Sequence, residues 1–374
     1  MANAGGPLPI VRVRWRPFRL PLIAPFETAS GPLTERLGVL IELTDGTGHV
    51  GVGEATPLPG RGDDTVEGVL RLIEWFAAEV AGSAVLAPPA RLEGPGSAAL
   101  DCAFDSAMLD IAGQRLGFSV AGLLVERPAS PVAVNAVIGL GSVEDIQTAG
   151  RRAVEAGYRT LKLKVGRPTT VEDVAHVKAL REACPNATIR IDANGAWGPT
   201  TAAAALQQLA PFRIEYVEQP LPANDRVGMA RLRRESPIPI AADEAASTFI
   251  AAQRIIEAGA ADILILKPMQ LGGVQSALQL ARSAQSTGVR CVVTTSFESS
   301  IGVAAALHLA AALPNAAGAH GLATVEHLAA DLATEPLLPA GGVLELGREP
   351  GLGVRLDEAR LEAVATGPWR EATA

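Results

Sequence analysis

Residues 160–166 read Thr160-Leu161-Lys162-Leu163-Lys164-Val165-Gly166, with two lysines one residue apart in an otherwise apolar run. Such a run predicts a short β-strand, and alternation along a strand sends both lysine side chains to the same face. Two adjacent ammonium groups repel each other and burial favours the neutral form, so we expect a lowered pKa for at least one of them. A lysine of this kind can serve as a general base. The alternative is an edge strand whose lysines face solvent.

The sequence after residue 128 alternates short apolar segments with amphipathic ones. Strands are predicted at residues 132–138, 160–165, 189–191, 214–217, 238–242, 263–266, 289–294 and, as the weakest pattern, 318–320. Helices are predicted between them at residues 143–156, 171–183, 200–209, 248–257 and 274–286. Eight strands at this regular spacing predict an α/β fold, a TIM-like (β/α)8 barrel. A doubly wound open sheet is the alternative, although no glycine-rich dinucleotide-binding motif follows any strand.

The composition limits the partners and the location that we expect. The chain has 374 residues, 48% of them apolar and 19% charged, which is enough for a large core and for more than one ordinary domain. Its net charge of −8 disfavours nucleic acid or an anionic membrane as a partner. The cysteines are scattered, and neither a signal segment nor an apolar run of membrane-spanning length is present. We therefore expect a cytoplasmic protein that acts on a small molecule, and the sequence leaves homo-oligomer formation open.

The N-terminal third has a different pattern from the rest. Its expected elements are strands at residues 11–15, 39–43 and 50–54, then helices at 65–80 and 98–116. The interval 24–38 lacks periodicity, so we expect a loop there, either a lid or a surface loop. Strands followed by helices indicate an α+β domain over residues 1–128, before a barrel over 129–336. A C-terminal segment, 337–374, is expected to return to the first domain through short strands at 343–345 and 354–356.

Ionisable residues follow the apolar part of most predicted barrel strands. The second strand carries Lys162 and Lys164, and the later strands are followed by Asp192, Glu218, Asp243, Lys267 and, after strand seven, Ser296 and Glu298. The carboxyl ends of barrel strands line the mouth in which barrel enzymes place their active sites. The spacing therefore predicts an active site at this end of the barrel.

Three of these residues, Asp192, Glu218 and Asp243, are carboxylates from adjacent strands. Carboxylates brought together repel one another unless a cation joins them, and ligand sets made of oxygen suit Mg²⁺. A single carboxylate of this kind is more often a helix cap or a surface residue, but three in register predict a Mg²⁺ site, with Mn²⁺ as a substitute. Asp243 and Glu244 cannot both point inward from a regular strand. We choose Asp243 because its spacing from Glu218 continues the series.

Together these motifs resemble the muconate-lactonizing branch of the enolase superfamily over essentially the whole chain. The matching segments are the lysine pair Lys162 and Lys164, Asp192-Ala193-Asn194, Glu218-Gln219-Pro220, Asp243-Glu244 and Lys267-Pro268. The resemblance implies a modified barrel with a capping domain built from both termini, and a divalent metal on the three carboxylates. It implies that Lys164 is the acid/base and Lys267 a second acid/base or a cationic stabiliser. Lys162 would lower the pKa of Lys164 and touch the substrate carboxylate, and Asn194 would lie behind the metal ligands.

Within this branch, residues 53–61, 296–302 and 320–324 are similar to segments of o-succinylbenzoate synthases. The resemblance implies a metal-dependent lyase that dehydrates 2-succinyl-6-hydroxy-2,4-cyclohexadiene-1-carboxylate to o-succinylbenzoate, in menaquinone or phylloquinone synthesis. Lys164 would abstract the α-proton to give a metal-stabilised enediolate. The candidate substrate-binding residues are Ser296, Glu298, Asn194 and Arg36.

Other reactions of the branch remain as alternatives. Racemisation of N-succinylamino acids is the second prediction, because it would use the same lysines. Dipeptide epimerases hold a substrate ammonium with carboxylates near the eighth strand, whereas this sequence has no Asp or Glu between Glu298 and Glu326. Muconate cycloisomerase chemistry is a further alternative. A non-catalytic barrel used for binding is the alternative from another class, although binding alone does not require a lysine beside another charge.

Overall fold

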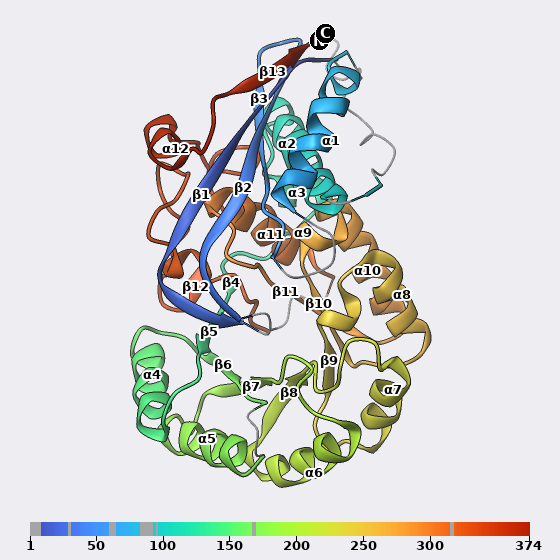
Figure 1. The fold of residues 1–374 in the computed structure, drawn as a ribbon, viewed down its shortest axis with the longest axis vertical. Coiled ribbons are helices and arrows are strands. Elements are labelled where there is room, and N and C mark those ends of the chain that lie inside the picture. The colour runs from blue at the N-terminus through green and yellow to red at the C-terminus, as the bar shows by residue number, and fades with distance from the viewer. Residues whose placement is uncertain are drawn as a thin grey trace.

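The computed structural model describes residues 9–28, 31–59, 65–82, 93–94, 96–166, 170–314 and 318–374. Figure 1 shows two parts, a curled parallel sheet surrounded by helices and an antiparallel sheet packed against α1 (Val66–Val80) and α2 (Ser97–Leu116). We call the second part the capping domain. Among the described residues, no helix is both long enough and apolar enough to cross a membrane.

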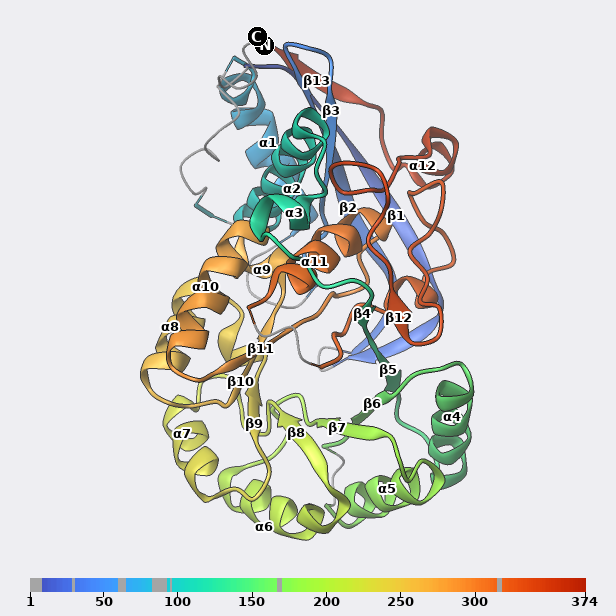
Figure 2. The ribbon, with the colours of Figure 1, turned by 180° about the vertical axis from the view of Figure 1, so that it is seen from behind.

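The parallel sheet has seven strands in the order β11-β10-β9-β8-β7-β6-β5. They are β5 (Asn135–Ile138), β6 (Thr160–Lys164), β7 (Thr188–Asp192), β8 (Ile214–Glu218), β9 (Ile240–Ala242), β10 (Ile263–Leu266) and β11 (Arg290–Val293). Every residue of β10 is buried, as expected of a strand covered on both faces. The sheet curls and its helices follow the outer side, as Figures 1 and 2 show. The barrel prediction is confirmed, and the doubly wound alternative is wrong.

The outer helices pack an apolar face on the sheet. They are α4 (Val143–Glu155), α5 (Thr170–Ala183), α6 (Pro199–Leu209), α7 (Arg226–Glu235), α8 (Phe249–Glu257) and α10 (Val274–Ser286). Three of those described, α4, α7 and α8, are also capped by a side chain at their N-terminus. Helix α4 begins at Ser142, which forms a reciprocal capping box with Asp145, and α8 begins at Thr248, whose hydroxyl accepts from the Ala251 amide. Between and beside them lie shorter elements: α3 (Val120–Leu124), α9 (Pro268–Leu271), η1 (Ala210–Phe212), η2 (Glu244–Ala246) and η3 (Val325–His327).

The eighth position of the ring is closed by single bridges rather than by a strand. His320 pairs with Val134 on one side and Gly321 pairs with Thr294 on the other, both in parallel. The buried guanidinium of Arg190 donates to the carbonyl of Ala319 at 2.7 Å and to the Asn135 side chain at 3.2 Å, which ties the closing segment to the sheet. The weak strand predicted at 318–320 is therefore reduced to this pair of bridges.

The capping sheet has the order β13-β1-β2-β3, formed by β1 (Ile10–Thr28), β2 (Gly31–Asp45), β3 (Val50–Ala55) and β13 (Arg370–Thr373). The loop predicted at 24–38 is wrong over the described residues, because they belong to a long hairpin in which Phe26 pairs with Leu33. Pro21, Pro25 and a register shift between Pro21 and Phe26 hide this strand from its local pattern. Residues 29–30 lie outside the described part.

The C-terminal segment returns to the capping domain by a different strand from those predicted. Strand β12 (Val343–Leu344) pairs with β4 (Val132–Ala133), and Leu356 forms only a bridge to Ala333. The return is made by β13, which pairs with β1 beyond the last helix, α12 (Glu358–Val364). The exposed Arg370–Thr373 run has no apolar alternation to mark it as a strand. The domain boundaries at residues 128 and 336 remain predictions.

Candidate active site

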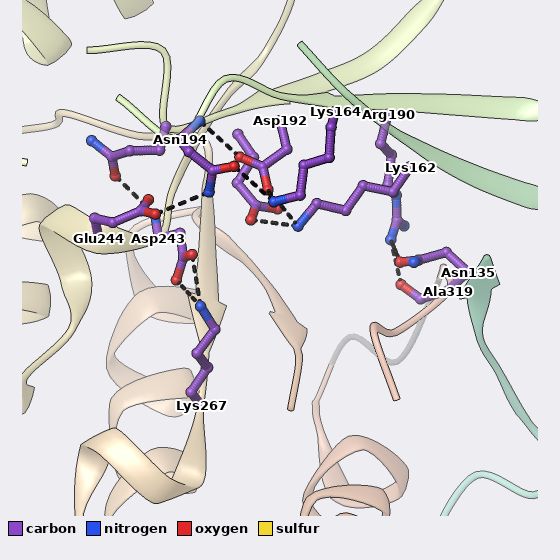
Figure 3. Close-up of polar contacts among 12 residues, drawn as sticks. Asn135, Lys162, Lys164, Arg190, Asp192, Asn194, Asp243, Glu244, Lys267 and Ala319 are labelled. Carbon is purple, nitrogen blue, oxygen red and sulfur yellow. Dashed lines mark hydrogen bonds and ion pairs between the residues drawn. The ribbon is translucent and has the colours of Figure 1, made fainter. Parts of the chain in front are cut away.

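Six ionisable side chains converge at the carboxyl ends of the barrel strands. Parallel register places Lys164 beside Asp192 and Asp192 beside Glu218 on β6, β7 and β8. Asp243 follows β9 and Lys267 follows β10, and all of them line one cavity. We call Lys162, Lys164, Asp192, Glu218, Asp243 and Lys267 the rim cluster. Figure 3 shows its lysines pointing toward the carboxylates from opposite sides.

Each carboxylate of the rim cluster contacts a lysine. Lys164 Nζ lies 2.8 Å from Asp192 Oδ2, and Lys162 Nζ lies 3.0 Å from the same oxygen and 2.6 Å from Glu218 Oε1. On the other side, Lys267 Nζ lies 2.5 and 2.6 Å from the two oxygens of Asp243. The lysine pair of β6 and the lysine after β10 therefore hold opposite sides of the acidic group.

Burial and pairing shift the pKa values of the rim cluster. Burial lowers the pKa of Lys162, but the carboxylates of Asp192 and Glu218 outweigh it and hold that pKa well above its ordinary value. For Lys162 this is opposite to the lowered pKa predicted for at least one lysine, because that prediction weighed only the neighbouring lysine and burial, and not the contacts of Lys162 with Asp192 and Glu218. Despite burial, Lys162 and Lys164 hold the pKa of Asp192 far below its usual range. Burial, with the charge of Asp192, raises the pKa of Glu218 to about 8.

Two side chains near the rim cluster orient its members. Asn194 accepts a hydrogen bond from Lys164 Nζ at 2.7 Å and donates to Glu244 Oε1 at 3.1 Å. Gln219, which has a left-handed backbone with φ 38°, accepts from the amides of Asp243 and Ala245 at 3.1 and 3.0 Å. Asp243 thus lines the cavity, while Glu244 turns to Asn194. In the sequence Gln219 is visible only as part of the Glu218-Gln219-Pro220 motif, which gives no sign of this role.

The cavity has a volume of about 140 Å³, with the rim cluster on one side and apolar side chains on the other. The apolar wall consists of Phe26, Leu33, Leu58, Pro59, Val137 and Phe297. Phe26 comes from the β1–β2 hairpin, and its ring lies 4.8 Å from that of Phe297, centroid to centroid, in an edge-to-face contact. The capping domain therefore completes the cavity that the barrel opens. A remaining wall of hydroxyl groups is formed by Thr294, Thr295, Ser296 and Thr324.

A family model described as "Enolase C-terminal domain-like" matches residues 145–360, more than half of the chain. The chain belongs to the enolase superfamily. It is 40% identical over 237 residues to an o-succinylbenzoate synthase of Thermobifida fusca (strain YX), covering 63% of this chain and 72% of that protein. It is 31% identical to a hydrophobic dipeptide epimerase of Enterococcus faecalis (strain ATCC 700802 / V583), covering 92% of this chain and 99% of that protein. A crystal structure of muconate lactonizing enzyme from Pseudomonas fluorescens, complexed with muconolactone, superposes with a TM-score of 0.89 at 30% identity, covering 96% of this chain and 100% of that one. The chain therefore lies in the branch of the enolase superfamily that contains these enzymes.

The rim cluster of this enolase superfamily member has the donor set that a hard divalent cation prefers. No His, Cys, Asp or Glu side chains among the described residues are gathered as a group of three that could hold a metal as they stand. Each rim carboxylate instead faces a lysine ammonium, which provides the positive charge. Glu218 Oε2 is nevertheless buried without a hydrogen-bond partner in the described part of the chain, and Asp192 and Asp243 lie on the neighbouring strand ends. Three converging carboxylates with an unused oxygen fit Mg²⁺.

The predicted substrate-binding residues occupy two different positions in this superfamily member. Asn194 and Ser296 line the cavity. Arg36 and Glu298 do not line it, because both are buried behind its wall, between the capping domain and the turn after β11. This geometry therefore does not favour direct contact of Arg36 or Glu298 with a bound substrate.

Several residues that line the cavity were not among the site residues predicted from the sequence. Phe26 and Leu33 reach it only through hairpin pairing, and Thr324 reaches it only because residues 320–321 close the barrel. Thr294 Oγ1 is buried without a hydrogen-bond partner among the described residues, which makes it available to a ligand. A polar residue at the end of strand seven was the one signal that could have identified Thr294. In the 53–61 segment, Leu58 and Pro59 line the cavity, while Gly60 and Arg61 lie outside the described residues.

Proposed function

We propose that this protein is an o-succinylbenzoate synthase, a Mg²⁺-dependent lyase that removes water from 2-succinyl-6-hydroxy-2,4-cyclohexadiene-1-carboxylate. The observation that carries the proposal is the placement of Lys164 and Lys267 on opposite sides of three convergent carboxylates. A carbon acid bound between them would present its α-proton to one lysine and its developing negative charge to the other. The synthase relative, at 40% identity, supports this choice of substrate.

In the proposed reaction Lys164 acts as the base and then as the acid. Asp192 and Asn194 orient Lys164 Nζ, which would accept the proton next to the substrate carboxylate. The same ammonium would return that proton to the departing hydroxyl group, so that the carbon–oxygen bond breaks and water leaves. Lys267 would stabilise the negative charge from the opposite side, and Lys162 would contact the carboxylate. Mg²⁺ held by Asp192, Glu218 and Asp243 would supply the positive charge that makes an enediolate accessible.

The choice of Asp243 over Glu244 as the third ligand is supported by their contacts. Asp243 lines the cavity opposite Lys267, whereas Glu244 Oε1 accepts from Asn194. Gln219 would support Asp243 by fixing the backbone on both sides of Glu244. We therefore assign Glu244 the role of orienting Asn194, which in turn orients Lys164.

We infer that the succinyl arm of the substrate lies against the hydroxyl wall. Ser296 and Thr294 line the cavity from the end of the seventh strand, and Thr294 Oγ1 has no other hydrogen-bond partner among the described residues. A carboxylate placed there would accept hydrogen bonds from these hydroxyl groups. The apolar wall opposite would pack against the ring of the substrate.

N-succinylamino acid racemisation is the second candidate, because the opposed lysines Lys164 and Lys267 could exchange a proton on either face of one carbon. Dipeptide epimerisation is less well supported, although a dipeptide epimerase is among the relatives. The part of the cavity near the eighth position is lined by Gly321 and Thr324, which offer no carboxylate for a substrate ammonium. Cycloisomerisation of muconate is a further alternative within the branch.

The test is a spectrophotometric assay with the cyclohexadiene carboxylate and Mg²⁺, with Lys164→Ala as the comparison. Aromatisation by the wild type that is lost in the variant would support the synthase proposal. Incorporation of deuterium from D₂O into N-succinylamino acids, without aromatisation, would instead identify the racemase. If neither reaction occurs and Mg²⁺ leaves the melting temperature unchanged, the non-catalytic barrel becomes the better interpretation.

A further inference from the structure

A second group of buried polar residues lies between the capping domain and the barrel, behind the cavity wall. It consists of Arg36 on β2, Glu54 on β3, and Glu298 and Ser299 at the start of α11 (Ser300–Ala312). We call these residues the turn cluster. None of them is more than 2% exposed. Burying a charge costs free energy unless the charge is paired or hydrogen-bonded. The contacts of these side chains therefore show how the charges are stabilised between the two parts of the molecule.

Glu54 of the capping domain caps a helix of the barrel. Its Oε1 accepts from the Ser299 amide at 3.1 Å, and its Oε2 accepts from the Gly302 amide at 3.1 Å and from the Ser299 hydroxyl. Helices leave their first amide groups without internal partners, and a carboxylate at that end is favoured by the helix dipole. A side chain at Gly302 would come 3.2 Å from Glu54 Oε2 and 2.6 Å from Glu298 Cβ. Glycine at this position therefore permits the approach of both carboxylates.

The capped helix directly follows the turn that forms one wall of the cavity. Ser296 and Phe297 line the cavity, and Glu298 accepts a hydrogen bond from the Ser296 amide within the same turn. Phe297 has φ 65°, a left-handed conformation that is strained for a bulky side chain. Such a conformation persists only when its surroundings hold it in place. The surroundings here include Glu54 and Arg36, which come from another domain.

Arg36 balances the charge of the turn cluster. Its Nη2 donates to the carbonyl of Thr56 at 2.7 Å, while Nε and Nη1 have no hydrogen-bond partner among the described residues. Burial lowers the pKa of Arg36, and the charges of Glu298 and Glu54 oppose that shift. The link to Glu54 runs through Thr56, whose carbonyl accepts from Arg36 and whose hydroxyl donates to Glu54 Oε1 at 2.5 Å, so a buried positive charge is held next to the carboxylate that caps the helix.

We propose that Glu54 and Arg36 are positioning residues, through which the capping domain holds the turn 296–298 in the conformation that binds substrate. The docked capping sheet presents a carboxylate to the start of α11 and a cation to Glu298. The cap fixes the helix start, and Glu298 accepts from the Ser296 amide and so holds the turn that carries Phe297. The kinetic part of this proposal rests on the proposed function, whereas its structural part does not.

The experiment measures hydrogen–deuterium exchange at the Ser296 amide, which contacts Glu298 and is not itself a partner of Glu54. Glu54→Gln replaces one acceptor oxygen by an amide nitrogen that cannot accept from Gly302 or Ser299. We expect faster exchange at Ser296 as well as at Ser299 and Gly302. With the cyclohexadiene carboxylate as probe, KM should rise about tenfold while kcat changes less than about threefold.

The chain provides a matched control in Asp105 of α2. This buried carboxylate also caps a barrel helix, since it accepts from the amides of Val274 and Gln275 at 2.7 and 3.2 Å. Asp105→Asn should speed exchange at the start of α10 and leave Ser296 and KM as in the wild type. If Ser296 exchanges alike in both variants, or stays protected in Glu54→Gln, the proposal is wrong.

Arg36→Lys provides a second variant if Glu54→Gln does not fold. It keeps a positive charge but loses the guanidinium that donates to the Thr56 carbonyl, so the same changes should occur with smaller amplitude. Unaltered exchange at Ser296 in folded Arg36→Lys would likewise refute the proposal. If the wild type turns over neither probe, the proposed function fails, and the exchange measurement still decides the role of Glu54 and Arg36.

Discussion

The rim cluster and the turn cluster both bury several charges, but they balance them in different ways. In the rim cluster, three side-chain ammonium groups form ion pairs with three carboxylates at the edge of a cavity. In the turn cluster, the carboxylates are satisfied mainly by backbone amides and hydroxyl groups of a helix start. An ammonium group on a flexible stem can change position and pass a proton to or from a bound molecule, whereas a backbone amide is fixed by the chain and does not act as an acid or base near neutral pH. The difference separates charges that are placed for chemistry from charges that hold a wall in position.

The largest expected effect comes from removing the base of the rim cluster. Lys164→Ala should reduce kcat by about 10³-fold, because proton transfer by a positioned side chain contributes on that order. Asp192 keeps Lys162 as a partner at 3.0 Å, so the variant should remain folded. Steady-state kinetics, with circular dichroism to verify folding, measures the effect. Lys178→Ala, which removes an exposed lysine paired with Glu182, is the control and should leave kcat unchanged.

The second largest expected effect is a dependence of the unfolding free energy on pH that comes from Glu298 of the turn cluster. Burial raises the pKa of Glu298 to about 7, from an ordinary value of 4.5, with Glu54 adding to the shift and Arg36 opposing it. A raised folded-state pKa means that stability is fully present below pH 4.5 and is lost as the pH rises through 7. Relative to Glu298→Gln, the wild type should therefore lose up to about 3 kcal/mol of unfolding free energy over this range. Denaturant unfolding of both proteins across the range measures it, and parallel curves would contradict the assignment.

Addition of Mg²⁺ should affect only the rim cluster. At a free concentration of 100 times Kd, binding to the folded state adds about 2.7 kcal/mol of stability, so the melting temperature should rise. Glu218→Gln should lose most of this increase, because it removes a charged ligand. Glu215→Gln alters the same strand at a carboxylate that contacts Arg190 instead, and it should keep the increase. An equal response in the two variants would argue against Glu218 as a ligand.

The smallest expected effect concerns the contact that joins the hairpin to the turn. Phe26→Leu removes the edge-to-face contact with Phe297 but keeps an apolar side chain. Aromatic pairs contribute about 0.5–1.5 kcal/mol beyond their buried area, so KM should rise about two- to tenfold with kcat little changed. Ile23→Leu, at an exposed position of the same strand, is the control. A change in kcat larger than that in KM would place Phe26 closer to the chemistry than we infer.

The sequence predicted the barrel and the convergence of the rim residues because strand ends repeat at a regular interval. Lys164, Asp192 and Glu218 needed only that register to be placed together. Their ion pairs could not be predicted in the same way, because the distances between ammonium and carboxylate groups depend on side-chain geometry. The raised pKa of Lys162, which follows from its closeness to Asp192 and Glu218, was missed for that reason. The hairpin was also missed, because the pairing of Phe26 with Leu33 depends on a register shift around two prolines.

Long-range packing explains the remaining differences. Arg36 was predicted as a substrate-binding residue because it lies in the interval 24–38, which was expected to be a loop near the substrate. The structure places it on β2 with its guanidinium on the Thr56 carbonyl, and one of the two carboxylates whose charges act on it, Glu298, is 262 positions away in the sequence. That separation has no periodic signal. The proximity of Arg36 on β2 to Glu298 after β11 arises only when the capping domain meets the barrel, and local patterns do not specify which surfaces meet.

The pairing of β1 with β13 also has a consequence for how the protein assembles. This pairing joins Arg12 to Thr373 and Trp15 to Arg370. The capping sheet is therefore completed by a strand that follows the whole barrel in the sequence. Contacts between segments so distant in sequence are entropically costly to close and tend to form slowly. The hairpin that carries Phe26 belongs to this sheet. During refolding, the parallel sheet and its helices should therefore form before the cavity is complete, and competence to bind a ligand should return as one of the last steps.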